Sequence, residues 1–402
     1  MMAGQPTELR RTTRLLTVVA LVSSLDRFIV APMLGAIAAD MGVGLGEAAA
    51  VATAYFLAYG AMQPVWGVVC DRLGRVRTLR LGLLLSAGLG LASAAAPSLG
   101  LLVIGRTLAG ACFGAAVPAV LVYIGDTVPL RFRQAAMTDV ISGVALGTAT
   151  AAAAGGLAAA AGWRWGFAST GVLALLLYTR LGALPEPVDV HKETPRVSMR
   201  TVLTNGWSLF IIALVSVEGF VLLGLFTFVP SALVHSGSGT RVAGLVASVF
   251  GVAVFVAAKV VKTMAVSPHR GATDFLAYGG LSGAIGCAVL VWRPVICAAL
   301  LACVLLGVSW ASMHSSLQTW ITEVTPEARA TAVAFFAAAL FAGGAAGGAI
   351  GGVLAGTEAY PELFGLGGVL FIPLTLLGVF GRARYARGAP VAGNPAAVQA
   401  ES

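Results

Sequence analysis

Long apolar segments alternate with short polar ones along almost the whole chain. Most of the apolar segments run for about 20 residues, the length of helix that crosses the hydrocarbon core of a membrane. Backbone groups in hydrocarbon must bond to each other, so these segments are expected to be helices. The pattern predicts about twelve spans, over residues 15–38, 46–69, 79–96, 99–123, 135–161, 165–184, 207–234, 241–262, 273–292, 294–321, 328–356 and 362–381.

One longer polar stretch divides these spans into two groups. Residues 185–206 hold three prolines and charges of both signs, which indicates a linker. We therefore expect an N-terminal six-helix bundle over residues 1–184 and a C-terminal six-helix bundle over residues 207–387. The final residues, 388–402, are mostly small and polar, and they are expected to form a disordered tail.

The two groups carry a weak internal repeat. The segment from Asp126 to Pro129 has the order acid, Thr, Val, Pro, and the segment from Glu323 to Pro326 has the order acid, Val, Thr, Pro. Each segment precedes a span rich in alanine and glycine. Duplicated halves are typical of secondary transporters, whose substrate site lies between the halves near the middle of the membrane.

Composition supports a membrane protein and excludes several functions. Hydrophobic residues make up 58% of the chain, charged residues 10%, and the mean hydropathy is +0.92. The five cysteines are scattered through apolar segments, without the spacing of a disulfide framework or a metal site. The chain has no phosphate-binding loop, zinc-binding helix motif or nucleophile elbow. We therefore expect no enzyme activity, cofactor or metal, and transport would have to use an ion gradient.

The net charge of +8 does not indicate nucleic-acid binding, because the basic residues follow the loops. Of the 25 lysines and arginines, most lie in alternate loops and in the two termini. This asymmetry is typical of positively charged loops that remain in the cytoplasm. It predicts an inner-membrane (plasma-membrane) protein with both termini in the cytoplasm. The loops predicted to lie outside hold only Arg164, Arg241 and Arg293.

An island of charge separates the second and third spans. It cannot lie in hydrocarbon, so it is predicted to be a short, sharply turned loop at the membrane surface. Its pattern, Gly-x-x-x-Asp-Arg-x-Gly-Arg-x-Arg, begins at Gly67 and ends at Arg77. This pattern resembles the loop signature between the second and third helices of the major facilitator superfamily. The resemblance covers essentially the whole chain. It implies an all-α fold with about twelve transmembrane helices in two pseudo-symmetric bundles that work by alternating access.

The resemblance also implies a cytoplasmic gate. Arg75 can reach Asp126, and Asp71 can cap the start of the eleventh span near Pro326. Such pairs would close the cytoplasmic side and break when the two halves move. The predicted gate residues are Gly67, Asp71, Arg72, Gly74, Arg75 and Asp126.

Few ionisable residues lie deep within the predicted spans. A charge at the bilayer centre costs roughly 2.5–3.5 kcal/mol on an insertion scale, so each is expected to face a wet cavity or a partner. Proton coupling requires an intramembrane carboxylate of this kind. The residues are Asp26 and Arg27 in the first span, Arg106 in the fourth, Glu218 in the seventh and His314 in the tenth.

Two of these residues, Asp26 and Arg106, stand in short motifs. The segment from Leu25 to Pro32 resembles the first-helix motif of the drug/proton antiporters, in which the aspartate, here Asp26, is implicated in proton coupling. Arg106 stands in a segment that resembles the fourth-helix Arg-x-x-x-Gly motif of the same superfamily. Alternatively, Asp26 forms a fixed pair with Arg27 or Arg106 that only holds helices together. Neighbouring helix residues point about 100° apart, which disfavours the pair with Arg27.

Glu218 leaves several roles open. It could take part in proton coupling, the role predicted for Asp26 and Arg106, or it could bind the substrate. Its partner could be Arg106, a proton or the substrate itself. His314 could serve in either way, although a lone helix histidine is more often hydrogen-bonded to a neighbour. The predicted substrate cavity is lined by Arg27, Tyr55, Tyr59, Phe226, Trp310 and His314.

The fifth span bears on the direction of transport. Its glycines resemble the antiporter motif of proton-driven drug exporters, but Ala151 and Ala152 stand where that motif has a Gly-Pro pair. The sequence predicts proton-coupled export of a small hydrophobic compound by a monomer in the lipid bilayer. Proton-coupled uptake of a small metabolite is the first alternative, and a non-transporting receptor or scaffold on the same helices is the second.

Overall fold

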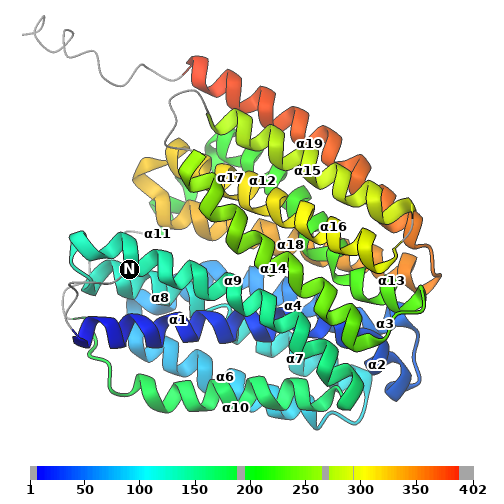
Figure 1. Cartoon of the computed structure of the whole chain (residues 1–402). Helices are drawn as coiled ribbons and strands as arrows, with labels where there is room; N and C mark the ends of the chain where they lie inside the picture. The colour runs from blue at the N-terminus through cyan, green and yellow to red at the C-terminus, as the bar shows by residue number, and fades with distance from the viewer. Residues whose placement is uncertain (1–6, 188–194, 265–270, 293, 389–402) are drawn as a thin grey trace, which may run out of the picture.

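The computed structural model describes residues 7–187, 195–264, 271–292 and 294–388. The regular structure of these residues is helical and contains no strand, as the sequence predicts. Figure 1 shows long helices that run roughly alongside one another. Residues 389–402, where we predicted disorder, lie outside the described residues.

Each of the first six predicted spans is found as one helix or as a series of consecutive helices. Breaks in a series fall at short interruptions such as Ile29 and Gly114. The elements are α1 (Thr7–Phe28) with α2 (Val30–Met41); α3 (Leu45–Ala48) with α4 (Ala50–Ala61) and α5 (Gln63–Leu73); α6 (Arg75–Ala94); α7 (Leu99–Phe113) with α8 (Ala116–Thr127); α9 (Leu130–Ala161); and α10 (Arg164–Leu181).

The remaining six spans follow a short helix, α11 (Pro195–Thr204), which lies in the predicted linker. Two of these spans contain a single π-helical turn. The elements are α12 (Gly206–Gly219) with the π turn η1 (Phe220–Gly224), the 3₁₀ turn η2 (Leu225–Phe228) and α13 (Val229–His235); α14 (Thr240–Met264); α15 (Ala272–Trp292); α16 (Ile296–Ser309) with the π turn η3 (Trp310–His314) and α17 (Ser315–Val324); the 3₁₀ turn η4 (Pro326–Ala328) with α18 (Arg329–Gly356); and α19 (Tyr360–Gly388).

By length and apolarity, nine helical segments of the described chain could each cross a membrane. The pair α1 and α2, bent by 40° at their junction, would make a tenth. The two other predicted spans, residues 46–69 and 165–184, correspond to the broken series α3 to α5 and to α10. These two are helical but are not among the nine.

The outer faces of these helices are apolar. Large hydrophobic side chains are more than half exposed on several helices, which would be unfavourable in water but suits contact with lipid. The protein is therefore a multi-pass membrane protein. Examples are Leu57, Leu101, Ile104, Leu157, Leu281, Val353 and Phe380.

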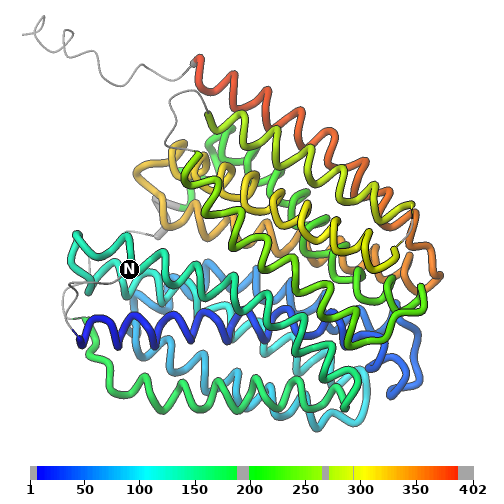
Figure 2. The backbone as a smooth tube through the Cα atoms, in the orientation of Figure 1, coloured from blue at the N-terminus to red at the C-terminus, as the bar shows by residue number. Residues whose placement is uncertain are grey.

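The helices form two groups along the chain. In Figure 1, α1, α6 and α10 lie in the lower part of the molecule and α15, α16 and α19 in the upper part. The groups meet where α9 packs against α14 and where α4 packs against α18. Figure 2 shows the start of α1 and the end of α19 on the same side of the molecule. We call this side, where α6 also begins (Figure 1), the terminal end.

The predicted surface loop after the second span is mostly helical. Residues 67–73 belong to α5 and α6 begins at Arg75, so a single residue, Gly74, connects two helices. Gly74 has φ of 97°, a backbone conformation that glycine adopts without steric cost. The predicted short, sharp turn corresponds to the single residue Gly74, but the charged residues on either side of it are helical, because charges exclude a segment from hydrocarbon yet do not stop a helix from continuing into water.

Close packing of α1 against α9 provides a test of the fold. A side chain at Gly147 would collide with the backbone of Leu21, which cannot easily move. We expect Gly147→Val to destabilise the protein by about 1–3 kcal/mol because the site is overpacked. Thermal unfolding in detergent would measure the loss. Gly88→Ala is the matched control, since nothing lies within 4 Å of its added Cβ, and it should not lower stability.

Candidate functional site

Asp26 and Arg106 form a buried ion pair between α1 and α7. Arg106 Nη1 donates to Asp26 Oδ1 at 3.0 Å and Nη2 donates to Oδ2 at 2.9 Å. Nη2 also donates to the Asp26 carbonyl at 2.9 Å. Thr170 Oγ1, on α10, donates to Asp26 Oδ1 at 2.7 Å. One carboxylate therefore connects three helices, two residues before α1 ends at its bend.

Aromatic rings enclose this pair. The Arg106 guanidinium lies 4.5 Å from the ring centres of both Tyr55 and Phe167. Each charged side chain is only 1% exposed, so the pair lies in a low-dielectric environment. Tyr55, predicted to line the cavity, covers the ion pair instead. Removing one partner from such a pair is far more costly than replacing both, because a lone charge would remain buried.

Arg27 points to a different part of the molecule from Asp26, as the angle between adjacent helix residues predicts. Its Nη2 donates to the hydroxyl of Tyr59 at 3.1 Å. The guanidinium lies 4.4 Å from the ring centre of Tyr59 and 5.1 Å from that of Phe341. Since Phe341 is on α18, Arg27 lies where the two groups of helices meet. Stacking of this kind contributes about 0.5–2 kcal/mol.

A second buried pair joins α12 to the η3 turn. His314 Nδ1 lies 3.1 Å from Glu218 Oε2, and the other carboxylate oxygen, Oε1, is buried without a hydrogen-bond partner. The Glu218 side chain is fully buried, whereas that of His314 is 16% exposed. The ring of Trp310 stacks on His314 at 4.5 Å between centres. The partner of Glu218 is therefore His314, and the alternative partner Arg106 is already bound to Asp26.

Both π turns lie beside this second pair. Glu218 comes two residues before η1, and His314 is the last residue of η3. Single π turns within α-helices often occur at functional sites, because they rotate side chains out of the regular helical pattern. Neither turn was predictable, since the hydrophobic pattern continues through both of them.

Phe226 belongs to an aromatic series that leads to His314. Its ring lies 4.3 Å from that of Phe250 on α14, which in turn lies 6.4 Å from Trp310. The sequence reasoning missed Phe250, as well as Phe341 and Thr170. Of these three residues, only Thr170 could have been noticed in the sequence, because it is a hydroxyl residue within an apolar span. Phenylalanines in apolar spans give no such signal.

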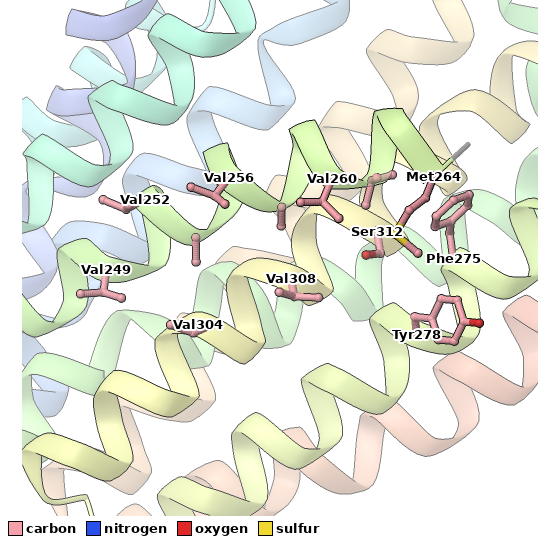
Figure 3. A pocket seen from close by; sticks show the side chains of 13 residues that line it. Val249, Val252, Val256, Val260, Met264, Phe275, Tyr278, Val304, Val308 and Ser312 are labelled. Carbon is pink, nitrogen blue, oxygen red and sulfur yellow. The ribbon is translucent and has the colours of Figure 1, made fainter. Parts of the chain in front are cut away.

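An apolar cavity of about 610 Å³ lies between α14, α15 and α16. Figure 3 shows the valine side chains of α14 along it and the rings of Phe275 and Tyr278 at its other wall. None of the six predicted cavity residues lines it, but it includes Ser312 of η3, the turn that also carries Trp310 and His314. The lining residues are Val249, Val252, Ala253, Val256, Ala257, Val260, Val261, Met264, Phe275, Tyr278, Val304, Val308 and Ser312.

The predicted gate residues meet around Arg75 at the terminal end. Arg75 Nε donates to Asp126 Oδ2 at 2.9 Å, and its Nη1 lies 3.1 Å from Asp71 Oδ1. Nη1 also donates to the Cys70 carbonyl at 2.9 Å. Asp71 thus pairs within its own turn. In the part of the chain that the structure describes, it makes no hydrogen bond to the start of α18. Arg72 is exposed, Gly74 stands between Asp71 and Arg75 in the chain, and Gly67 lies four residues before Asp71.

Glu186, in the predicted linker, supplies the N-terminal cap of α6. Its carboxylate accepts from the amides of Val76 at 3.1 Å and Arg77 at 3.2 Å. The Tyr123 hydroxyl donates to the carbonyl of Pro185 at 3.2 Å. An anion at a helix N-terminus is favourable because the unpaired amides point towards it. The beginning of the linker is therefore fastened to the gate, and no motif in the sequence indicated this.

Acidic, cysteine and histidine side chains do not gather into a metal site within the described ranges, where no three come together in a suitable group. Apart from the cluster around Arg75, the buried charges of these ranges form two pairs, Asp26–Arg106 and Glu218–His314, with Arg27 in neither of them. An arrangement of this kind can take up and release protons or bind a charged group.

The family model of the Major Facilitator Superfamily matches residues 16–333. The chain belongs to the major facilitator superfamily. It is therefore a transporter and not an enzyme, as the loop signature predicted. The match includes both buried pairs and Arg27.

Curated relatives are named as transporters. A triacylglyceride transporter of Mycolicibacterium smegmatis is 32% identical over 130 residues, which are 32% of this chain and 23% of the relative. A protein of Mycobacterium tuberculosis named "probable multidrug-efflux transporter" is 31% identical over 232 residues, 56% of this chain and 47% of the relative. The puromycin resistance protein of Streptomyces alboniger is 34% identical over 192 residues, 46% of this chain and 37% of the relative. Each match thus spans less than half of the relative's length.

Solved transporters share the fold over nearly the whole chain. A D-xylose–proton symporter superposes with a TM-score of 0.76 at 18% identity, covering 95% of this chain and 98% of that one. A bacterial homologue of the human lysosomal transporter Spinster, in an inward-facing and occupied conformation, gives 0.78 at 15% identity, covering 97% and 100%. At these identities the similarity shows the fold alone.

The Asp26–Arg106 pair yields a stability test. Arg106→Gln would leave Asp26 buried and unpaired, and we expect a loss of about 3–5 kcal/mol at neutral pH. The double variant Asp26→Asn, Arg106→Gln should recover most of this loss, because no lone charge remains. Reversible unfolding in mixed detergent micelles would compare the wild type, the two single variants Asp26→Asn and Arg106→Gln, and the double variant. Additive losses from the two substitutions would contradict a direct pair.

Proposed function

We propose that this transporter exports a small, largely apolar compound from the cytoplasm in exchange for protons. The observation that supports this most directly is Asp26, a carboxylate that is buried, charge-paired and placed beside the bend between α1 and α2. A carboxylate that can lose its charge by protonation is the element that proton coupling requires.

The proposed cycle uses the contacts of Asp26. While it is ionised, Asp26 accepts bonds from Arg106 and Thr170 and so holds α1 to α7 and α10. A proton on the carboxyl would cancel its attraction for the guanidinium and loosen these three helices together. The protonated and ionised forms would therefore favour different arrangements of the two halves, residues 1–184 and 207–387. Release of the proton inside would restore the pair.

The Glu218–His314 pair provides a second place for a proton. The pair lies in the second group of helices, next to two π turns. Glu218 Oε1 has no hydrogen-bond partner among the described residues, so a proton can bind to it. Both groups of helices would then contain a proton-sensitive contact. Arg106 would act on the first and His314 on the second.

The substrate class is supported by the walls of the cavity and by the relatives. The cavity beside η3 is lined almost entirely by aliphatic and aromatic side chains, and η3 also carries Trp310, which belongs to the aromatic series of Phe226 and Phe250. Such surfaces bind apolar molecules without strict geometry. Relatives named for efflux and drug resistance are consistent with export.

Proton-coupled uptake is the second candidate, and one observation favours it. Ala151 and Ala152 replace the Gly-Pro pair of the antiporter motif in α9. The two functions differ in the direction of proton movement: protons move opposite to the substrate in export by antiport and together with it in uptake by symport. In both cases the gate around Arg75 would lie at the cytoplasmic surface of the inner membrane, with both termini on the same side.

Replacing the proposed proton carrier should uncouple transport. We expect Asp26→Asn to abolish uphill transport driven by a pH gradient in proteoliposomes, because the amide cannot change its charge. Downhill exchange of the same compound should continue. The measurement uses fluorescent apolar dyes screened first against the wild type. Asp40→Asn, an acid that pairs with Arg164 away from the buried sites, is the control. Normal accumulation by Asp26→Asn would refute the assignment.

Weakening the gate should change turnover more than affinity. Asp71→Asn removes one of the two carboxylates that hold Arg75, and it lies near the end of α5, a helix that carries no member of the two buried pairs. We expect a several-fold lower transport rate with little change in dye binding, because only the conformational equilibrium is altered. Labelling of engineered cysteines from each side of the membrane reports this shift. Arg77→Gln, an exposed neighbour, serves as control. Lost binding at unchanged rate would place Asp71 in the substrate site instead.

A further inference from the structure

Three arginines are buried in the described part of the chain, and one of them differs from the others. Arg75 and Arg106 each pair with carboxylates. Arg27 is 7% exposed, and no carboxylate of the described residues lies within 4 Å of it. A guanidinium remains charged at any physiological pH, so Arg27 cannot avoid the cost of burial by losing its proton.

The surroundings of Arg27 leave donors available. Among the described residues, its one hydrogen bond is donated to the Tyr59 hydroxyl at 3.1 Å, and its buried Nε has no partner. The rings of Phe28, Tyr59 and Phe341 stand around the guanidinium, with centres 4.4 to 5.4 Å away. Aromatic faces stabilise a cation, but they do not satisfy its N–H groups as a carboxylate would.

The position of Arg27 is suited to a ligand that enters between the halves. Arg27 belongs to α1 and Tyr59 to α4, whereas Phe341 belongs to α18, and the rings of Tyr59 and Phe341 lie 4.6 Å apart. Separation of α4 from α18 would therefore uncover the guanidinium. Substrate sites of transporters built from repeated halves lie at this kind of junction.

The balance of buried charge also singles out Arg27. Asp26 is neutralised by Arg106, and Glu218 has His314 as its partner. When the Glu218–His314 pair holds one proton it is neutral, and Arg27 is then the unbalanced charge among these five side chains. An anion is the ligand that would complete this group.

We propose that Arg27 binds an anionic group of the transported compound, and that this compound is an organic acid whose carboxylate is attached to an apolar, preferably aromatic, body. The guanidinium would hold the carboxylate through Nε and a terminal nitrogen, as forked donors do. The rings of Phe28, Tyr59 and Phe341 would contact the apolar body. The inference deepens the proposed export function by naming its substrate class, but binding by Arg27 does not depend on the direction or coupling of transport.

The test compares ligands that differ only in charge. Binding of 2-naphthoate, the neutral 2-naphthamide and the cation 2-naphthylmethylammonium would be measured by calorimetry on purified full-length protein in lipid nanodiscs. We expect the wild type to bind the carboxylate about tenfold more tightly than the amide, as a charge-assisted contact allows. Arg27→Gln should reduce this ratio to about one, whereas Arg27→Lys should keep part of it.

Controls separate a local effect from a general one. Arg164→Gln removes an arginine that already pairs with Asp40, and it should leave the ratio unchanged. Arg27→Lys retains the charge, so it keeps the test decisive if Arg27→Gln does not fold. The proposal is overturned if the wild type binds the carboxylate no better than the amide, including the case in which it binds neither. It is also overturned if Arg27→Gln keeps the full ratio.

The same proteins distinguish this inference from the proposed function. Dye export driven by a pH gradient, together with no preference for 2-naphthoate, would support proton-coupled export and reject the anion site. The opposite result is a binding preference for 2-naphthoate over 2-naphthamide that depends on Arg27, together with no dye export driven by a pH gradient. This result would support the anion site and reject proton-coupled export.

Discussion

The cost of placing charge in a low-dielectric interior governs the central part of this protein. Nearly every helix is apolar on its outer face, so a charged side chain within the bilayer must turn inward and find a partner. Asp26 and Arg106 satisfy this demand with two direct hydrogen bonds between their side chains. The pair connects helices that are distant in sequence. Its stability depends on both members being charged, which makes it sensitive to a proton.

The packing of the helices depends on a different property. Lipid provides no hydrophobic drive for helix association, so the spans approach closely through glycine and alanine. Gly147 against Leu21 is one such contact, in which backbone lies against backbone. Close approach allows many weak contacts to form within each of the two groups of helices. The buried charges lie among these closely packed helices, and Arg27 lies where the two groups of helices meet.

The gate and the buried pairs obey the same electrostatics in different surroundings. At the terminal end, Arg75 is shared between two partly exposed carboxylates, where water weakens each contact. Such contacts can break and form again at modest cost. Glu186 adds a further anion beside them at the start of α6. Weak contacts around Arg75 and a strong internal pair are the combination that the proposed change of conformation would require.

The family, the all-helical fold and the approximate positions of the spans follow from the amino-acid sequence, because a membrane imposes segment length and apolarity along the chain. The sequence also indicates which buried residues carry charge, since Asp26, Arg27, Arg106, Glu218 and His314 are rare exceptions in apolar runs. Which of these residues pair is known only from the contacts between helices in three dimensions. The partner of Glu218, the role of Thr170 and the isolation of Arg27 depend on helix rotation and on contacts between distant segments. The hydrophobic pattern does not encode those angles, because one apolar face permits many helix neighbours.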